Sequence, residues 1–417
     1  MSTISPKAAK LEAALQGAML HHQAGRLSEA ERLYRRILRD RPSHLGTNTA
    51  LGMALKDQGK LDEAAAAFQR VVAVAPDHPA GHNNLGTLLY QQGKLKEAEA
   101  SYRRALALNP DMVDALKNLG LVIVDSGRIA ESFVPFRRHA ELAYAEPESS
   151  ARGFEPAPPY KARHDEEQRD YLNGGKAVGD GAAAKFHLEE GARVTGRAVN
   201  RDNSRGNIAA RWQSSSPQIA VIDDVLADEA LDGIRRYCWC STIWHQTFPN
   251  GYLGAMPEHG FACPLVAQIA DELRSTYPAI MGDHPLLRWW GFKYDSRLRG
   301  INVHADFAAV NVNFWITPDE ANLDPESGGL VIWDAPAPLD WGFNQYNSPG
   351  AGPRIREFLA RTGAKSITVP YRANRAVIFD SDLFHETDRI NFKEGYLNRR
   401  INITMLYGSR ESAAKWT

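Results

Sequence analysis

A repeat of 34 residues in the first third of the chain is the feature that most constrains its fold. Glycines recur at this spacing as Gly25, Gly59, Gly93 and Gly127, and each is followed by a basic and then an aliphatic residue. Three further residue classes keep the same spacing: small Ala30, Ala64 and Ala98, aromatic Tyr34, Phe68, Tyr102 and Phe136, and Pro42, Pro76 and Pro110. Glycine permits a tight turn between helices, and proline ends a helix. The pattern therefore predicts a stack of antiparallel helix pairs.

The period and its residue classes resemble the tetratricopeptide repeat family. Four units cover residues 11–146, and Leu51-Gly52, Leu85-Gly86 and Leu119-Gly120 mark the first helix of three of them. The first unit has Gly17-Ala18 instead, and the fourth has Ser132 and Tyr144 at the alanine and proline positions, as end repeats often deviate. The resemblance implies an α-helical solenoid, whose groove holds a peptide or protein partner or which serves assembly alone.

Composition narrows the class of protein. The chain has 49 Lys plus Arg against 50 Asp plus Glu, which gives no electrostatic reason to expect nucleic acid as a partner. No apolar run is long enough to span a membrane, and the N-terminus lacks the pattern of a signal peptide. We therefore expect a cytoplasmic protein whose three cysteines are reduced. The sequence leaves its oligomeric state open.

The rest of the chain divides into a linker and a strand-rich domain. Residues 147–216 are rich in Pro, Ser, Glu and Gly, with one charged stretch that can form a short helix. From 217 to 410 short strand-like runs follow one early helix at 228–240. Many short strands predict an antiparallel jelly-roll or barrel.

Three side chains in this strand-rich part suit a metal ion. His304 and Asp306 lie two residues apart in a run predicted as a strand, so both side chains would share one face with Asn302. His385 follows the predicted strand at 375–380. Two imidazoles and one carboxylate are the ligand set of non-haem Fe(II) oxygenases. His304, Asp306 and His385 are thus the predicted iron ligands.

The order of these motifs resembles the 2-oxoglutarate- and Fe(II)-dependent dioxygenases, especially their prolyl-hydroxylase-like branch. The shared features are His304-x-Asp306 with the distal His385, the phrase SGGLVIW, and Arg400 opening a strand of the form R-x-x-I-T. The resemblance implies a double-stranded β-helix, which is a jelly-roll of cupin-like type. It also implies the cosubstrates 2-oxoglutarate and O₂, hydroxylation of a substrate, and release of succinate and CO₂.

The resemblance further implies a cosubstrate pocket. Arg400 is expected to hold the distal carboxylate of 2-oxoglutarate, because a guanidinium binds a carboxylate through two hydrogen bonds. Tyr294 and Trp315 stand where relatives have cosubstrate-contacting tyrosines, and Thr404 shares the strand face of Arg400. The adjacent Arg399 faces the opposite side. A tryptophan- and proline-rich insertion at 333–352 is expected to help cover the site or bind substrate.

Three functions remain open from the sequence. The first is a dioxygenase that hydroxylates a peptide, protein or carrier-bound substrate recruited by the repeats. The second is the same iron chemistry on a free small metabolite, with the repeats used for assembly. The third is a non-catalytic interaction protein whose β-domain binds a ligand. The presence of all three metal ligands together with Arg400 favours an enzyme.

Overall fold

The structure is a computed structural model that describes residues 6–145, 157–174, 186–200, 205–282, 284–296 and 300–410. The chain forms two compact units, Met1–Ser126 and Gly127–Thr417, which are described separately below.

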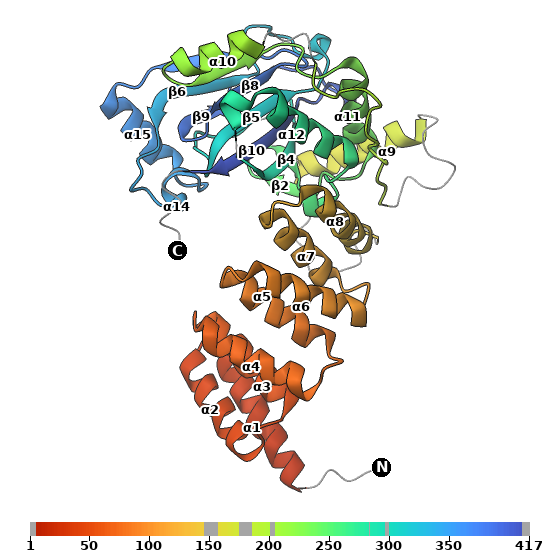
Figure 1. Cartoon of the computed structure of the whole chain (residues 1–417), viewed down its shortest axis with the longest axis vertical. Helices are drawn as coiled ribbons and strands as arrows, with labels where there is room; N and C mark the ends of the chain where they lie inside the picture. Colours follow the sequence, from red (N-terminus) through yellow and green to blue (C-terminus); the bar gives the residue numbers. More distant parts are fainter. Residues whose placement is uncertain are drawn as a thin grey trace. The chain divides into compact units, whose positions relative to one another are not determined.

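The first unit is an array of α-helices (Figure 1). Its helices are α1 (Pro6–Gln23), α2 (Leu27–Asp40), α3 (Leu45–Asp57), α4 (Leu61–Val74), α5 (Pro79–Gln91), α6 (Leu95–Leu108) and α7 (Val113–Asp125). The turn glycines Gly25, Gly59 and Gly93 have φ values of 73–74°, a left-handed conformation that strongly favours glycine. The predicted helix pairs of the array are therefore present, with the glycine at each turn.

Close helix contacts explain the Leu-Gly pairs of the array. A Cβ atom on Gly52 would lie 2.6 Å from the Phe68 ring, and one on Gly86 would lie 2.8 Å from the Tyr102 ring. Phe68 of α4 thus packs directly on the backbone of α3, and Tyr102 of α6 packs on the backbone of α5. Both rings are buried in the apolar core of the array.

The boundary between the two units falls inside the fourth predicted repeat. Helix α8 (Ile129–Ala143) belongs to the second unit, where the Phe133 ring packs edge-on against Trp289 at 5.8 Å. The Arg137 guanidinium donates to the carbonyls of Leu188 and Glu189. The repeat pattern predicted that this helix belongs to the array at residues 11–146. In the structure its contacts join it to the second unit.

Parts of the region predicted as a linker also pack into the second unit. The charged stretch forms α9 (Pro159–Gly174), as its sequence predicted, and Arg205–Ser214 forms α10. Glu167 of α9 accepts from Arg399 at 2.7 Å, and Gln168 of α9 donates to the Tyr396 hydroxyl at 2.8 Å. Farther along, the Val194 amide donates to Gln268. These described parts of 147–216 are therefore part of the domain surface.

The second unit contains two antiparallel sheets. The larger has seven strands in the order β1-β8-β5-β10-β4-β3-β2, and the smaller has the order β7-β6-β9. The strands are β1 (Ile219–Ile222), β2 (Gln246–Phe248), β3 (Tyr252–Ala255), β4 (Leu286–Tyr294), β5 (Ala308–Trp315), β6 (Leu330–Pro336), β7 (Ser366–Val369), β8 (Ala376–Asp380), β9 (Leu383–Thr387) and β10 (Ile401–Ser409). The remaining helices are α11 (Asp228–Cys240), α12 (Pro264–Thr276), α13 (Pro278–Met281), α14 (Phe343–Tyr346) and α15 (Gly352–Thr362).

The two faces of β10 meet different surroundings. On one face the Tyr407 hydroxyl donates to the Ala270 carbonyl of α12 at 3.0 Å, so a helix covers this side. On the other face, Asn402 and Thr404 line a cavity together with residues of β6 and β9, so this side faces the smaller sheet. The cavity described below lies on this inner face, between the sheets.

No helix in the described part of the chain combines the length and the hydropathy needed to cross a membrane.

Candidate metal centre

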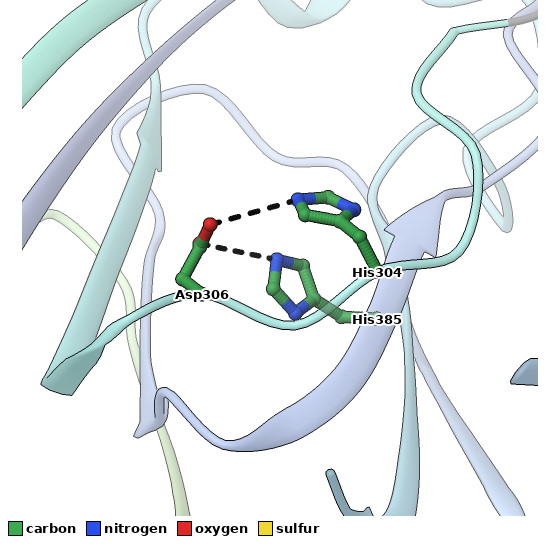
Figure 2. A group of neighbouring side chains, drawn as sticks. All are labelled: His304, Asp306 and His385. Carbon is green, nitrogen blue, oxygen red and sulfur yellow. Dashed lines mark ion pairs between the residues drawn. The ribbon is translucent and has the colours of Figure 1, made fainter. Parts of the chain in front are cut away.

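His304, Asp306 and His385 come together in the second unit (Figure 2). Their candidate ligand atoms all lie within 4.8 Å of one another. The Asp306 carboxylate is 3.9 Å from Nε2 of His304 and 3.6 Å from Nε2 of His385, and both rings turn toward it. These three side chains can therefore bind one metal ion together.

The backbone that holds the three residues differs in part from the predicted strand. Residues 301–307 form an irregular segment, which pairs with β9 through a single bridge between His304 and His385. Their backbone amides exchange hydrogen bonds of 3.0 and 2.8 Å across this bridge. His385 lies within strand β9, which the sequence pattern missed. The expected strand at 301–307 is wrong because the segment leaves the sheet after this one bridge.

Hydrogen bonds fix the same tautomer in both histidines. Nδ1 of His304 lies 2.9 Å from the Asn302 carbonyl, and Nδ1 of His385 lies 3.0 Å from the Leu383 carbonyl. A carbonyl only accepts, so each Nδ1 carries the proton and each Nε2 keeps its lone pair. This backbone arrangement orients metal-binding imidazoles in many proteins.

Each oxygen of the Asp306 carboxylate accepts a hydrogen bond from an asparagine amide. Asn311 of β5 donates to one oxygen at 2.6 Å, and Asn347 donates to the other at 3.1 Å. Asn347 also donates to the Ala305 carbonyl at 2.6 Å and lies in the predicted insertion. Sequence reasoning missed both asparagines, because only the fold brings the insertion to Asp306.

Burial alters the protonation of the ligands. Burial lowers the pKa of His385 well below its usual value, and the adjacent His304 lowers it further. The imidazole is therefore neutral at neutral pH, as metal binding requires. Burial raises the pKa of Asp306, while His304, Asn347 and Asn311 oppose that shift. A divalent cation would compensate the buried carboxylate, so the donor set fits Fe(II).

A cavity of about 330 Å³ of empty space extends from the three residues into the second unit. The cavity is lined by Trp290, Phe292, Tyr294, Ile301, His304, Asp306, Asn313, Leu330, His385, Thr387, Arg400, Asn402 and Thr404. The candidate metal ligands and Arg400 therefore line the same cavity.

Arg400 is a buried cation in this cavity and is 1% exposed. Its Nε donates to the Gly328 carbonyl at 2.6 Å and its Nη2 to the Gly329 carbonyl at 3.3 Å. Nη1 is buried and has no hydrogen-bond partner among the described residues. Burial lowers the pKa of Arg400, and Tyr294 and Tyr371 oppose that shift. A guanidinium nevertheless stays charged in proteins. It thus presents an unused donor that suits an anion.

The other predicted cosubstrate residues have different positions. Tyr294 and Thr404 line the cavity, and the Arg400 guanidinium lies 4.6 Å from the centre of the Tyr294 ring. Trp315 is fully buried in the apolar cluster between the sheets, outside the cavity lining, and its ring lies 5.6 Å from the same guanidinium. The Asn302 side chain is exposed and contributes only its carbonyl to His304.

Arg399 has different partners from its neighbour. Its guanidinium is 2.7 Å from Glu167 of α9 and 3.3 Å from Asp295. Arg399 therefore attaches α9 to the domain, whereas Arg400 points into the cavity. This is the division that strand alternation predicted.

A buried chain of hydrogen bonds connects the two ends of the cavity. Thr404 and Asn402 both donate to Oδ1 of Asn313 at 2.8 Å. Asn313 donates to Asn311 at 2.5 Å, and Asn311 donates to Asp306. The side chains beside Arg400 and the candidate metal ligand thus belong to one connected network.

Comparison with known proteins identifies the repeats. The family described as Tetratricopeptide repeat matches residues 49–112 and 85–145. The chain contains tetratricopeptide repeats. No curated protein matches the chain.

Similar solved structures cover about a third of the chain. A crystal structure of the MamA protein is 21% identical over 32% of this chain and 73% of that chain, with a TM-score of 0.31. MamA from Desulfovibrio magneticus has the same identity and TM-score and is covered to 75%. An O-GlcNAc transferase mutant from Thermobaculum terrenum is 28% identical over 35% of this chain and 28% of that chain, also with a TM-score of 0.31. The functional interpretation therefore depends on the site itself.

Proposed function

We propose that the second unit is an Fe(II)- and 2-oxoglutarate-dependent dioxygenase that hydroxylates its substrate. We also infer that its two antiparallel sheets, which share an apolar core, form a double-stranded β-helix. The observation that carries the proposal is the cavity shared by His304, Asp306, His385 and Arg400, whose Nη1 has no hydrogen-bond partner in the described part of the chain.

Each residue has a role in this proposal. His304, Asp306 and His385 would hold Fe(II) through two imidazole nitrogens and one carboxylate oxygen. Bound Fe(II) supplies the oxidising chemistry that couples conversion of 2-oxoglutarate and O₂ to succinate and CO₂ with hydroxylation of a C–H bond. Arg400 would bind the distal carboxylate of 2-oxoglutarate in a site from which water is largely excluded. A charge-assisted hydrogen bond is strong in such a site.

The residues that line the cavity indicate how 2-oxoglutarate would lie in it. Leu330 and Phe292 line the space together with the polar groups of Thr404 and Tyr294. A small dicarboxylate that enters this space would have one carboxylate near the Arg400 guanidinium and the other end near the candidate metal ligands. In this arrangement the substrate itself would approach the candidate metal ligands from the opening of the cavity.

The repeats favour a peptide, protein or carrier-bound substrate. Tetratricopeptide repeats bind other proteins through surfaces formed by stacked helices, which is consistent with a protein partner for this chain. A free small metabolite would leave the repeats with an assembly role only.

The test measures metal binding and turnover in the same preparation. Wild-type protein should bind one equivalent of Fe(II) in anaerobic calorimetry and should form succinate from 2-oxoglutarate when O₂ is admitted. His304→Ala and His385→Ala should weaken Fe(II) binding at least about tenfold, because each removes one of the three ligands. His284→Ala, in the same unit but outside the cavity lining, is the matched control and should leave both measurements unchanged.

Two outcomes would contradict the proposal. Full Fe(II) binding by both ligand variants would place the metal elsewhere. Tight Fe(II) binding without any succinate, also in the presence of candidate peptide substrates, would favour a binding protein without turnover.

A further inference from the structure

Besides Nη1 of Arg400, two further polar atoms of the cavity have no partner. They belong to Trp290 of β4 and Asn402 of β10, which both line the cavity. Nε1 of Trp290 and Oδ1 of Asn402 are buried, and neither forms a hydrogen bond with any described residue. An indole N–H only donates and an amide oxygen only accepts. The cavity therefore contains one unused uncharged donor and one unused uncharged acceptor.

The acceptor role of Asn402 follows from the chain of hydrogen bonds that ends at Asp306. An ionised carboxylate only accepts, so the Asn311 amide must donate to it, at 2.6 Å. Asn311 therefore turns its oxygen to the Asn313 amide, and Asn313 turns its own oxygen to the Asn402 amide. Every amide in this chain donates in the direction of Asp306. Oδ1 of Asn402 is the acceptor that remains at the other end.

Burial makes these two atoms unfavourable without a ligand. Asn402 is 3% exposed, and Trp290 packs against an apolar cluster that contains Phe292 and Tyr294. A buried polar group without a hydrogen bond destabilises the folded state, and a ligand that supplies the partner removes this destabilisation. Two such atoms in one cavity thus point to a ligand group that both accepts and donates.

2-Oxoglutarate does not supply both partners. At neutral pH its two carboxylates and its keto group are acceptors, so none of them can donate to Asn402. A carboxylate would satisfy Trp290 but would repel the Asn402 oxygen. An ammonium group would satisfy Asn402 but would face the donor of Trp290 and the nearby cation of Arg400, which shares the strand face of Asn402. The group that meets both atoms is therefore uncharged.

The strand register separates Trp290 and Asn402 in a way that suits an amide. Trp290 pairs with Thr404, and Phe292 pairs with Asn402, so Trp290 and Asn402 are diagonal neighbours on β4 and β10. Residues in such diagonal positions lie about 7–8 Å apart. An amide accepts on its oxygen and donates on its nitrogen, whereas a hydroxyl group must do both at one atom. An amide therefore bridges the two side chains better than a hydroxyl group does.

We propose that Trp290 and Asn402 recognise an uncharged amide group of the substrate. The amide oxygen would accept from Nε1 of Trp290, and an amide N–H would donate to Oδ1 of Asn402. This inference rests on the proposed function, because it names the chemical class of the substrate that reaches the metal site. Peptide bonds and the side chains of asparagine and glutamine carry this group in a protein, and small amides carry it in a free metabolite.

The test measures binding without turnover. Ligand-observed NMR titrations use the full chain under nitrogen, with and without Fe(II) and 2-oxoglutarate. The probes are four-carbon compounds with different polar groups: butyramide, N-ethylacetamide, butanoate, butylammonium and 1-butanol. At least one of the two amides should bind at least about fivefold more tightly than the other three compounds. Tighter binding of N-ethylacetamide would assign the subsite to a peptide bond, and tighter binding of butyramide would assign it to a primary amide.

Trp290→Phe removes the unused N–H and keeps an aromatic ring. It should weaken amide binding at least about threefold and leave the binding of 1-butanol unchanged, because one hydrogen bond to the amide is lost. Trp239→Phe is the matched control. Trp239 of α11 is also partly buried, and its Nε1 likewise has no hydrogen-bond partner in the described part of the chain, but it lies outside the cavity lining. This control should bind the amides like the wild type.

Asn402→Leu removes the acceptor at similar side-chain volume and should also weaken amide binding at least about threefold. Thr404 still donates to Asn313 in this variant, so the rest of the hydrogen-bond chain keeps its direction. Circular dichroism melting shows whether each variant is folded.

Three results would overturn the proposal. They are equal weakening of amide binding by Trp290→Phe and Trp239→Phe, binding of butanoate or 1-butanol as tight as that of the amides, and no amide binding under either condition. Amide binding that depends on both Trp290 and Asn402, in a chain that forms no succinate, would support the amide subsite and contradict the dioxygenase instead.

Discussion

At the scale of single residues, Arg400 is a cation buried in the cavity of the second unit. Most buried guanidinium groups pair with a carboxylate, but this one is held by two glycine carbonyls and keeps Nη1 without a partner in the described chain. Desolvating a charge is unfavourable unless an anion or several hydrogen bonds compensate. The arrangement therefore favours binding of an anionic ligand over a structural role.

Arg400→Ala should raise the KM for 2-oxoglutarate at least about tenfold, because the loss of one partner of a buried charge pair costs roughly 2–5 kcal/mol. Arg399→Ala should change the KM less than about twofold and should instead lower the thermal stability, since it removes the ion pairs with Glu167 and Asp295. Succinate formation as a function of 2-oxoglutarate concentration measures both variants. The reverse order of effects would mean that the cosubstrate binds on the other face of β10.

Asn347 is a positioning residue for Asp306, and its contribution can be measured separately. Asn347→Ala should weaken Fe(II) binding about 10- to 100-fold, the range typical for hydrogen-bond partners of metal ligands. Asn344→Ala, three residues earlier and exposed in α14, is the matched control and should bind Fe(II) normally. If calorimetry gave the same affinity for both variants, the insertion would not help to orient the carboxylate.

At the scale of elements, the start of β6 joins the cavity around Arg400 to the smaller sheet. Gly328 and Gly329 supply the carbonyls that hold Arg400, and Gly328 has a φ of 83°. A Cβ atom on Gly329 would lie 1.9 Å from the Val369 carbonyl oxygen of β7. The backbone of β6 can approach β7 this closely only with glycine at this position.

Gly329→Ala should lower the free energy of unfolding by about 2 kcal/mol or more, because the added methyl group forces β6 and β7 apart. It should also raise the KM for 2-oxoglutarate, since the carbonyls that hold Arg400 would move. Gly350→Ala is the control: no heavy atom lies within 4 Å of its added Cβ, and its stability should change by less than about 0.5 kcal/mol. Denaturant unfolding of both variants gives the comparison, and equal stability would contradict the tight approach of the strands.

At the scale of the whole molecule, the division between the units separates the two helices of the fourth predicted repeat. Helix α8 buries Phe133, Phe136 and Ala140 and belongs to the β-domain unit. The Ala140 side chain would lie 3.5 Å from a Cβ on Gly260. The second unit therefore includes one helix of repeat-like sequence within its own core.

A fragment of residues 127–417 should fold cooperatively and bind Fe(II) like the full chain. A fragment of residues 147–417 lacks α8, exposes the Trp289 edge that Phe133 covers, and should melt at least about 5 °C lower, since 1 kcal/mol corresponds to about 2–4 °C in a domain of this size. Thermal unfolding followed by circular dichroism compares the two fragments. Equal melting temperatures would mean that α8 contributes nothing to the stability of the β-domain.

Much of the architecture could be predicted from the sequence because the determining contacts are local. Each repeat packs on its neighbours in the chain, so a glycine turn, a small residue and an aromatic residue at fixed spacing are sufficient to predict the helix pairs. Strand alternation likewise predicted that Arg400 and Thr404 share one face of β10 and that Arg399 lies on the other. The three candidate metal ligands were predicted from their residue types and order, and the structure brings them together.

Only the tertiary structure decided the contacts between segments far apart in the chain. Asn347 reaches Asp306 across 41 residues, Arg400 reaches the Gly328 carbonyl across 72, and Glu167 reaches Arg399 across 232. No periodic pattern encodes such pairs, because they depend on how loops close and on which faces of the sheets meet. For the same reason the sequence placed α8 in the repeats, as the family model also does, without showing that α8 packs into the second unit, and it placed α9 in a linker. The packing of α8 and α9 depends on residues that are close to them in space but far from them in the sequence.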